Sequence, residues 1–244
     1  MKEWQVSNQT IFEIGPLTEY LAALRYTLRC EGEERRLLLV VGDPGTGKTV
    51  GARIFRQEQT VKSPIYLSLP AAGVLRPRDL LDLLGRPVGL SFDLHYPRYE
   101  VGQQLARDSL ARPRIFLLDE AQALAKGGLL DMIRWLHDTG GHTFVLIGPP
   151  SLEHALLDHR EVAGRVVLRH QLRLPTVEEI EPFFPGFPPE AIEQIHQETG
   201  GRMREVIALR DWITELADQH KLSVPELRAK QVQVVARHVL VKVA

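Results

Sequence analysis

The stretch Gly42-Asp43-Pro44-Gly45-Thr46-Gly47-Lys48-Thr49 decides the fold that we predict for this chain. An apolar run, LLLVVG at 37–42, leads into it, and VGARIFRQEQ at 50–59, which has helical spacing, follows it. A buried strand, a glycine-rich loop and a helix in this order form the context in which the pattern G-x-x-x-x-G-K-[ST] binds phosphate. The glycines let backbone N–H groups curl around phosphate oxygens, and the helix N-terminus adds unpaired donors. We therefore predict that residues 42–49 bind the phosphates of ATP.

Two side chains of this loop have roles of their own. Lys48 can reach the β- and γ-phosphates as a point charge, and the Thr49 hydroxyl is placed to ligate Mg²⁺. The alternative, a glycine-rich turn without function, would not require a lysine and a threonine at these two positions. Since both are present, the sequence predicts ATP and Mg²⁺ as ligands.

A second motif, Ile115-Phe116-Leu117-Leu118-Asp119-Glu120, is an apolar run that ends in two acids. A carboxylate at the C-terminal end of a buried parallel strand lies at the edge of the sheet where ligands bind. We predict that Asp119 holds Mg²⁺ through water and that Glu120 orients or deprotonates the attacking water. An acid at a strand end is often only a turn residue, but downstream of the loop at 42–49 this pair indicates ATP hydrolysis.

Short apolar segments alternate with segments of helical spacing, which predicts an α/β fold with a five-stranded parallel sheet. The expected strands are 37–42, 64–69, 114–119, 143–148 and 166–174. The strand at 64–69 lies between the two motifs. This additional strand separates such ATPases from GTPases and nucleotide kinases, so we expect hydrolysis rather than phosphoryl transfer to a small substrate.

The character of the sequence changes after Leu174, because all later apolar segments have helical spacing. Thr176-x-x-Glu179 marks the start of the first of these helices. We therefore predict a nucleotide-binding α/β core at 1–175, with a helical lead-in at 1–36. A small all-helical lid with a C-terminal helix is expected at 176–244.

Composition excludes several classes of protein. A net charge of −1 argues against a polycation that wraps nucleic acid nonspecifically. No run reaches the roughly 18 apolar residues that span a bilayer, and the N-terminus lacks the apolar run of a secretory signal. Cys30 is the only cysteine, so a reducing, cytoplasmic setting without a membrane is expected. The pairs His137/His142 and His154/His159 lack a third ligand at metal-site spacing, which predicts structural or surface histidines.

Several arginines are candidates for contact with phosphate. Arg160, Arg165 and Arg169 follow the fourth strand, where an exposed arginine can reach a neighbouring subunit's nucleotide and stabilise its transferring phosphoryl group. Arg165 is our first choice for this arginine finger, and a solvated helix with ion pairs is the alternative. In the helical part, Arg204 could face the γ-phosphate or could be a surface arginine.

Together these motifs resemble those of the AAA+ ATPases: the loop at 42–49, the pair Asp119-Glu120, a strand between them, and G-x-x-R at 201–204 in a helical lid. Within that superfamily the chain is most similar to the transposon target-selection ATPases, the group of phage Mu B protein and the TnsC and TniB regulators. The segments that carry this similarity are LLDEAQAL at 117–124, FVLIGPPSL at 144–152 and REVAGRVVLRHQLRLPTVEEI at 160–180.

The resemblance implies an ATPase that assembles into rings or helical filaments on duplex DNA and recruits or stimulates a transposase or other recombination protein. It assigns Arg165 to the finger position and Arg204 to the second sensor. One departure is that Gly148-Pro149-Pro150 stands where the superfamily usually has a polar first-sensor residue. We therefore expect slow or partner-stimulated hydrolysis.

DNA contacts in that family come from the loops after the second strand. The resemblance therefore assigns backbone contacts to basic and aromatic residues of this region, namely Arg76, Arg78 and Arg98, with His95 and Tyr96 as further candidates. Repeated in every subunit, such contacts give salt-sensitive binding, whereas a charged loop that touches only solvent is the alternative. Two other functions stay open: a replication or helicase-loading ATPase, and an ATPase of a secretion or signalling assembly that needs no DNA.

Overall fold

The structure is a computed structural model, which describes residues 3–6, 9–12, 14–26, 37–59, 63–70, 74–90, 97–111, 114–220 and 224–240. Its contacts divide the chain into two compact units. An α/β unit comprises Tyr20–Asp43 and Lys48–Leu172, and a helical unit comprises Met1–Glu19, Pro44–Gly47 and Arg173–Ala244. Cys30, His95 and Tyr96 lie outside the described residues.

The α/β unit is built on a five-stranded sheet with the order β4-β5-β6-β3-β7, and every neighbouring pair is parallel. Its strands are β3 (Leu37–Val41), β4 (Ile65–Ser68), β5 (Ile115–Asp119), β6 (Thr143–Gly148) and β7 (Val166–Gln171). The predicted α/β fold with five parallel strands is thereby confirmed. The last strand ends at Gln171 rather than at Leu174. Gln171 is paired with Val41, the last residue of β3, and the N–H of Leu172 makes the final hydrogen bond, to the carbonyl of Val41.

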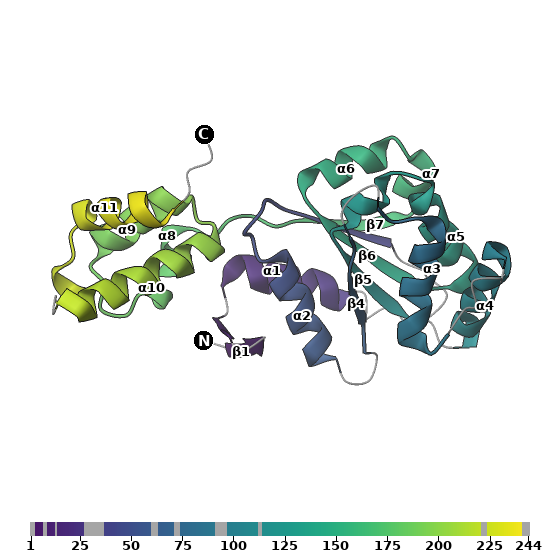
Figure 1. The fold of residues 1–244 in the computed structure, drawn as a ribbon, viewed down its shortest axis with the longest axis horizontal. Helices are drawn as coiled ribbons and strands as arrows, with labels where there is room; N and C mark the ends of the chain where they lie inside the picture. The colour runs from purple at the N-terminus through teal and green to yellow at the C-terminus, as the bar shows by residue number, and fades with distance from the viewer. Residues whose placement is uncertain are drawn as a thin grey trace. The chain divides into compact units, whose positions relative to one another are not determined.

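Side chains alternate between the two faces of the central strands and so form a separate core on each face. On one face, Leu37 and Leu39 of β3 and Phe116 and Leu118 of β5 join a buried cluster with helices α3, α4 and α5. Figure 1 shows α2 on the opposite side of the sheet from these helices. Because both faces are covered, β3 and β5 are buried along their whole length, as expected for parallel strands.

The helices of this unit connect the strands in the usual alternating order. They are α1 (Gly15–Tyr26, which begins in the other unit), α2 (Lys48–Glu58), α3 (Pro77–Gly85), α4 (Arg98–Ala111), α5 (Leu129–Gly140), α6 (Pro150–Leu157) and α7 (Arg160–Ala163). Two short 3₁₀ segments are η1 (Arg86–Val88) and η2 (Ala121–Ala125).

The segment after β4 differs from its prediction as a DNA-contact loop, because Arg78 lies in helix α3 and Arg76 directly precedes the first residue of that helix. Pro77 occupies the first turn of this helix, where its missing N–H costs nothing. The backbone N–H of Arg76 donates to the carboxylate of Asp79 at 3.0 Å. Leu80, Leu81 and Leu84 are buried on one face of α3. The proline, the N-terminal cap and the apolar spacing together specify a helix, although the arginines alone are compatible with a loop.

The helical unit packs around its own apolar core. Its elements are α8 (Val177–Ile180), η3 (Glu181–Phe183), α9 (Pro189–Thr199), α10 (Met203–His220), η4 (Val224–Glu226) and α11 (Ala229–Val239). The predicted capping box is present, since Thr176 N–H donates to Glu179 at 2.9 Å and the Thr176 hydroxyl accepts from Glu179 N–H. In the part of the chain that the structure describes, no helix is long and apolar enough to cross a bilayer.

The N-terminal lead-in contains more than the expected helix. Two short strands, β1 (Glu3–Val6) and β2 (Gln9–Phe12), pair antiparallel before α1 begins. Their sequences, EWQV and QTIF, are rich in aromatic and β-branched residues, which favour strands over helices. Helix α1 itself agrees with the helical expectation for this region.

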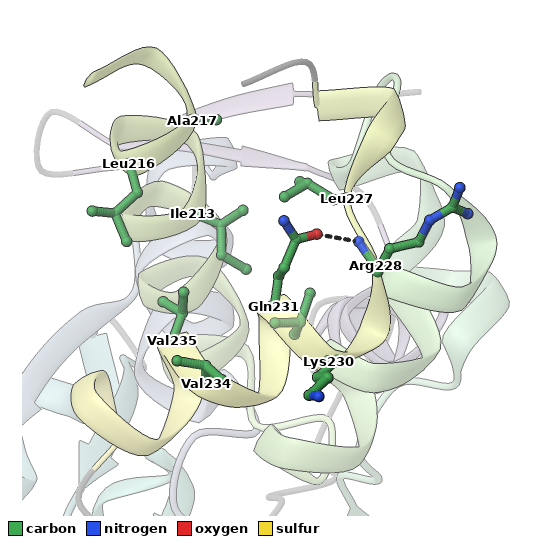
Figure 2. A pocket seen from close by; sticks show the side chains of 10 residues that line it. Ile213, Leu216, Ala217, Leu227, Arg228, Lys230, Gln231, Val234 and Val235 are labelled. Atoms are coloured by element: carbon green, nitrogen blue, oxygen red, sulfur yellow. Dashed lines mark hydrogen bonds between the residues drawn. The ribbon is translucent and has the colours of Figure 1, made fainter. Parts of the chain in front are cut away.

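An open groove of about 610 Å³ lies between α10 and α11 of the helical unit (Figure 2). Its lining is mostly aliphatic, with Ile213, Leu216 and Val235 among the contributors. Gln231 lies in the groove and accepts a hydrogen bond from the backbone N–H of Arg228 at 2.7 Å. Among the described residues, the charged side chains of the lining are Arg228 and Lys230, and none of its members is acidic.

The two-sided core of the sheet yields a stability prediction. Phe116 is fully buried and stacks on Phe144 with ring centroids 5.3 Å apart. We expect Phe116→Ala to lower the free energy of unfolding by about 3–5 kcal/mol, because it leaves a cavity and removes buried apolar surface. Urea denaturation followed by circular dichroism measures this loss. The control Val74→Ala changes a side chain that is 66% exposed and should alter stability by no more than about 0.5 kcal/mol. Equal effects of both variants would contradict the prediction.

Candidate nucleotide-binding site

The end of β3 and the start of α2 flank the glycine-rich loop in the context that the sequence predicts. The N–H of Gly42 donates to the carbonyl of Gly148 at 3.2 Å and so ties the beginning of the loop to the end of β6. Gly45 and Gly47 have φ values of 86° and 90°, a left-handed conformation that glycine adopts without steric cost. A Cβ on Gly47 would meet no atom within 4 Å. The requirement for glycine at position 47 is therefore conformational rather than steric.

Lys48, the first residue of α2, rests on backbone oxygens of the loop. Its ammonium group donates to the carbonyls of Gly42 and Asp43, the latter at 2.8 Å. Partial burial lowers the pKa of Lys48, while the negative charges of Asp119, Glu120 and Asp43 oppose this shift. A half-buried ammonium that is satisfied only by neutral carbonyls has a strong electrostatic preference for an anion. The arrangement therefore suits a phosphate group.

Asp119 joins the two motifs. It lies at the end of β5, is 2% exposed, and its Oδ2 accepts a hydrogen bond from the Thr49 hydroxyl at 2.6 Å. Its Oδ1 accepts from the backbone N–H of Glu120 at 3.0 Å. A hydroxyl and a carboxylate in contact are hard oxygen ligands of the kind that Mg²⁺ takes, typically together with substrate phosphates. Thr49 and Asp119 thus fit the ion that the sequence predicts, and these two residues would hold it.

Sequence reasoning missed Tyr66, which reaches the same carboxylate from β4. Its hydroxyl donates to Asp119 Oδ2 at 2.7 Å, and Arg53 of α2 lies over its ring at 5.6 Å. Burial and the hydrogen bond to Asp119 raise the pKa of Tyr66 to about 12, so this group stays a donor. The signal was available, because a tyrosine in an otherwise apolar strand needs a partner for its hydroxyl. The strand PIYLSL had been used only as an element of the sheet.

Glu120 adopts an unusual backbone conformation directly after β5. Among the residues that the structure describes, it is the only non-glycine with positive φ, at 58°. Its side chain is exposed, and its carboxylate accepts a hydrogen bond from the Gln122 amide at 2.6 Å. Non-glycine residues in this conformation cost about 1–2 kcal/mol and cluster at functional sites. The geometry agrees with a carboxylate that is presented to a ligand rather than packed into a turn.

The three finger candidates differ in their partners. Arg165 donates through Nε to both carboxylate oxygens of Asp138, at 2.6 and 2.9 Å, and this hydrogen-bonded pairing raises the pKa of Arg165. Arg169 pairs with Glu153. Arg160 is exposed, and no side-chain partner for it exists within the described ranges. Arg160 is thus the arginine of this group that lacks a partner among the described residues.

The arginines predicted to contact DNA also differ in their ion-pair partners and in their exposure. Arg76 pairs with Asp79 at 3.0 Å and keeps a side chain that is 80% exposed. Arg78 faces Asp82 at 3.6 Å and is 17% exposed. Arg98 begins α4, and its side chain lies outside the described part of the protein. Each of the first two arginines has an acidic neighbour one helical turn away.

At the start of α10, residue Arg202 rather than Arg204 has an acidic partner. Arg202 pairs with Glu205 at 2.6 Å. A Cβ built on Gly45, a loop residue assigned to the same unit, would lie 3.2 Å from the Cβ of Arg202. The N–H of Met203 donates to the Gly45 carbonyl at 3.2 Å. Arg204 is exposed and has no bonded side-chain partner in the described chain. Its role as a sensor stays a prediction.

The histidines of the α/β unit serve structure. His137 and His142 are buried, and His137 Nδ1 lies 3.0 Å from the carbonyl of His142. His142 Nδ1 accepts from the N–H of Arg114 at 3.3 Å. No group of three or more His, Cys, Asp or Glu side chains could hold a metal ion in the portion of the chain described above. This finding is compatible with Mg²⁺, which needs few protein ligands.

Solved structures of similar fold include ORC and Cdc6 proteins. The ORC1 protein of Aeropyrum pernix in complex with DNA has a TM-score of 0.64 and 20% identity, with 92% of this chain and 64% of that chain covered. The ORC2 protein of the same organism, in ADPNP–ADP complexes, has a TM-score of 0.64 and 14% identity, covering 91% and 67%. Cdc6p of Pyrobaculum aerophilum has a TM-score of 0.70 and 16% identity, covering 93% and 67%.

These likenesses, at or below 20% identity, establish the AAA+ P-loop fold. The chain spans 64% of the length of the ORC1 chain that it matches. No curated protein matches the sequence. Residues 30–156, more than half of the chain, match the family described as "AAA domain". This chain therefore belongs to the AAA domain family of P-loop proteins.

Proposed function

We propose that this protein binds ATP with Mg²⁺ and hydrolyses it to ADP and phosphate. The observation that carries the proposal is the 2.6 Å hydrogen bond between Thr49 and Asp119. It brings the start of the phosphate-binding helix and the acidic end of β5 to one point. Lys48 directly precedes Thr49, and Glu120 directly follows Asp119. A purely structural turn would not need a lysine, a hydroxyl and two acids at that point.

Each residue then has a distinct task. Bound Mg²⁺ would supply neutralisation of the charge that develops on phosphate oxygens. Lys48 exchanges its carbonyl partners for phosphate oxygens, and Thr49 and Asp119 hold the ion. Glu120 accepts a proton from the water whose oxygen attacks the γ-phosphorus, as the bond from that phosphorus to the β–γ bridging oxygen breaks. ADP and phosphate leave, and Glu120 then releases its proton to solvent.

We further propose that this ATPase acts on DNA in a replication-type role, the alternative to transposition that the sequence leaves open. Support comes from the solved structures of similar fold, since they include an ORC1 protein in complex with DNA. The names of the ORC1, ORC2 and Cdc6p proteins make no reference to transposition. A transposase as partner therefore stays a sequence-based prediction.

The proposal includes assembly of several copies, in which an arginine of one subunit completes the site of the next. Arg160 replaces Arg165 as our first choice for this finger. Arg165 would have to give up a two-oxygen hydrogen bond to Asp138, whereas Arg160 is exposed and has no partner to give up in the described chain. An arginine that is free before assembly loses less on engaging a phosphate.

Removal of the lysine charge tests nucleotide binding. We expect Lys48→Ala to weaken binding of a fluorescent ATP analogue by on the order of 10- to 100-fold or more, because a charge-assisted contact to phosphate is lost. Lys126→Ala is the matched control, since Lys126 is exposed and lies outside the site. Titration monitored by fluorescence measures both affinities. Native affinity in Lys48→Ala would remove the basis of the proposal.

Neutralisation of the proposed base separates hydrolysis from binding. We expect Glu120→Gln to bind the ATP analogue as tightly as the native protein while its turnover falls by about 10²- to 10⁴-fold. Phosphate release and analogue titration measure the two properties on the same sample. Turnover at the native rate would show that another group activates the water.

Binding to DNA has its own test. With a nonhydrolysable ATP analogue, we expect fluorescence anisotropy to show affinity for a labelled duplex that falls steeply as salt rises. Arg76→Glu should weaken this binding, because the Arg76 side chain is 80% exposed. Arg56→Glu, at an exposed position of helix α2, is the control. Failure to bind duplex at low salt, with ATP hydrolysis intact, would favour a protein assembly as the partner instead.

A further inference from the structure

Among the described residues, the carboxylate of Glu120 has one side-chain donor, Gln122, two residues further along the chain. Gln122 lies in η2, the 3₁₀ segment that begins directly after Glu120. Its Nε2 donates to Glu120 Oε2 at 2.6 Å. A carboxylate only accepts hydrogen bonds, so the amide must turn its NH₂ side toward Glu120. The contact is therefore a charge-assisted hydrogen bond of the stronger kind.

The other end of this amide is unusual. Gln122 Oε1 is buried and has no hydrogen-bond partner within the described residues. A buried acceptor without a donor is unfavourable, and native proteins contain few of them. An amide that was free to reorient would turn its oxygen toward a donor or toward water. The bond to Glu120 thus determines how the Gln122 side chain lies.

The space for this amide comes from the end of β6. A Cβ built on Gly148 would lie 2.9 Å from Gln122 Oε1 and 2.9 Å from Cδ2 of Leu152. Any side chain at position 148 would therefore crowd the amide away from its present place. Gly148 is the last residue of β6, and β6 is paired with β5, which carries Asp119. The space left by the missing side chain of Gly148 at the end of β6 is thus occupied by the long side chain of Gln122, which follows β5.

We propose that Gln122 is the positioning residue for Glu120, and that Gly148 is kept small to admit it. This inference rests on the proposed function, because it assumes that Glu120 acts on the attacking water. Gln122 fixes one carboxylate oxygen and leaves the other oxygen of Glu120 to receive the proton. Without Gln122, the exposed Glu120 side chain samples several rotamers, and only a fraction of them point at the water.

The test compares turnover with binding in Gln122→Ala and in Gln122→Met, which preserves the length of the side chain without a donor. For both variants we expect the turnover number to fall by on the order of 10- to 100-fold, the factor associated with one charge-assisted hydrogen bond. The dissociation constant of a fluorescent ATP analogue should stay within about twofold of the native value, because among the described residues Gln122 donates to Glu120 and makes no hydrogen bond to the phosphate-binding loop. A merely structural role would weaken analogue binding and lower thermal stability together.

Two double variants make the inference sharper. Gln122→Ala in a Glu120→Gln background should cause no further loss of turnover, because the positioned group is already absent. Gly148→Ala should slow the native protein, yet have a smaller effect in the Gln122→Ala background, where the crowded amide is gone. Independent, multiplying effects in both pairs would overturn the proposal.

The outcomes also separate this inference from the proposed function. If native protein neither binds the analogue nor hydrolyses ATP, the proposed function fails. If native protein hydrolyses ATP and Glu120→Gln does not, but folded Gln122→Ala works at the native rate, only the role of Gln122 is wrong.

Discussion

The hydrogen bond between Thr49 and Asp119 joins residues that are 70 positions apart in the chain. It is possible because β3 and β5 are parallel and both lie next to β6, so that their C-terminal ends meet at one edge of the sheet. Sheet order, burial on both faces and the start of α2 all determine where these two side chains lie. Tyr66 adds a third donor to the same carboxylate. The site is thus a property of the sheet as a whole and not of the glycine-rich loop alone.

Much of this arrangement could be predicted from the sequence because it depends on local, periodic signals. The strands have short apolar runs, the loop has glycines where φ is positive, and Thr176 and Glu179 form the expected cap. Tyr66 and Gln122 were harder to predict, since their roles depend on which side chains meet across elements. Helix α3 differs from these two cases, because its apolar face is present in the sequence, whereas Arg76 and Arg78 by themselves are also typical of a surface loop.

The arginines show a second limit of sequence reasoning. A pattern gives the position of a charge along the chain but does not give its partner. Arg165 and Arg169 both meet carboxylates from other elements, Asp138 on α5 and Glu153 on α6. Exposed ion pairs of this kind contribute little to stability, yet they decide which guanidinium is available to a ligand. Availability is therefore a three-dimensional property even where sequence position is clear.

The left-handed backbone at Glu120 sets stability against the proposed chemistry at one position. Glycine would adopt this conformation without strain. A search for heat-resistant variants of this protein would therefore select Glu120→Gly and so remove the carboxylate. A laboratory that improves the protein for crystallisation or storage should hold residue 120 fixed, or monitor turnover alongside melting temperature. The same trade-off gives a rule for reading natural sequence variants: a glycine here would mark a chain that keeps the fold and has given up the reaction.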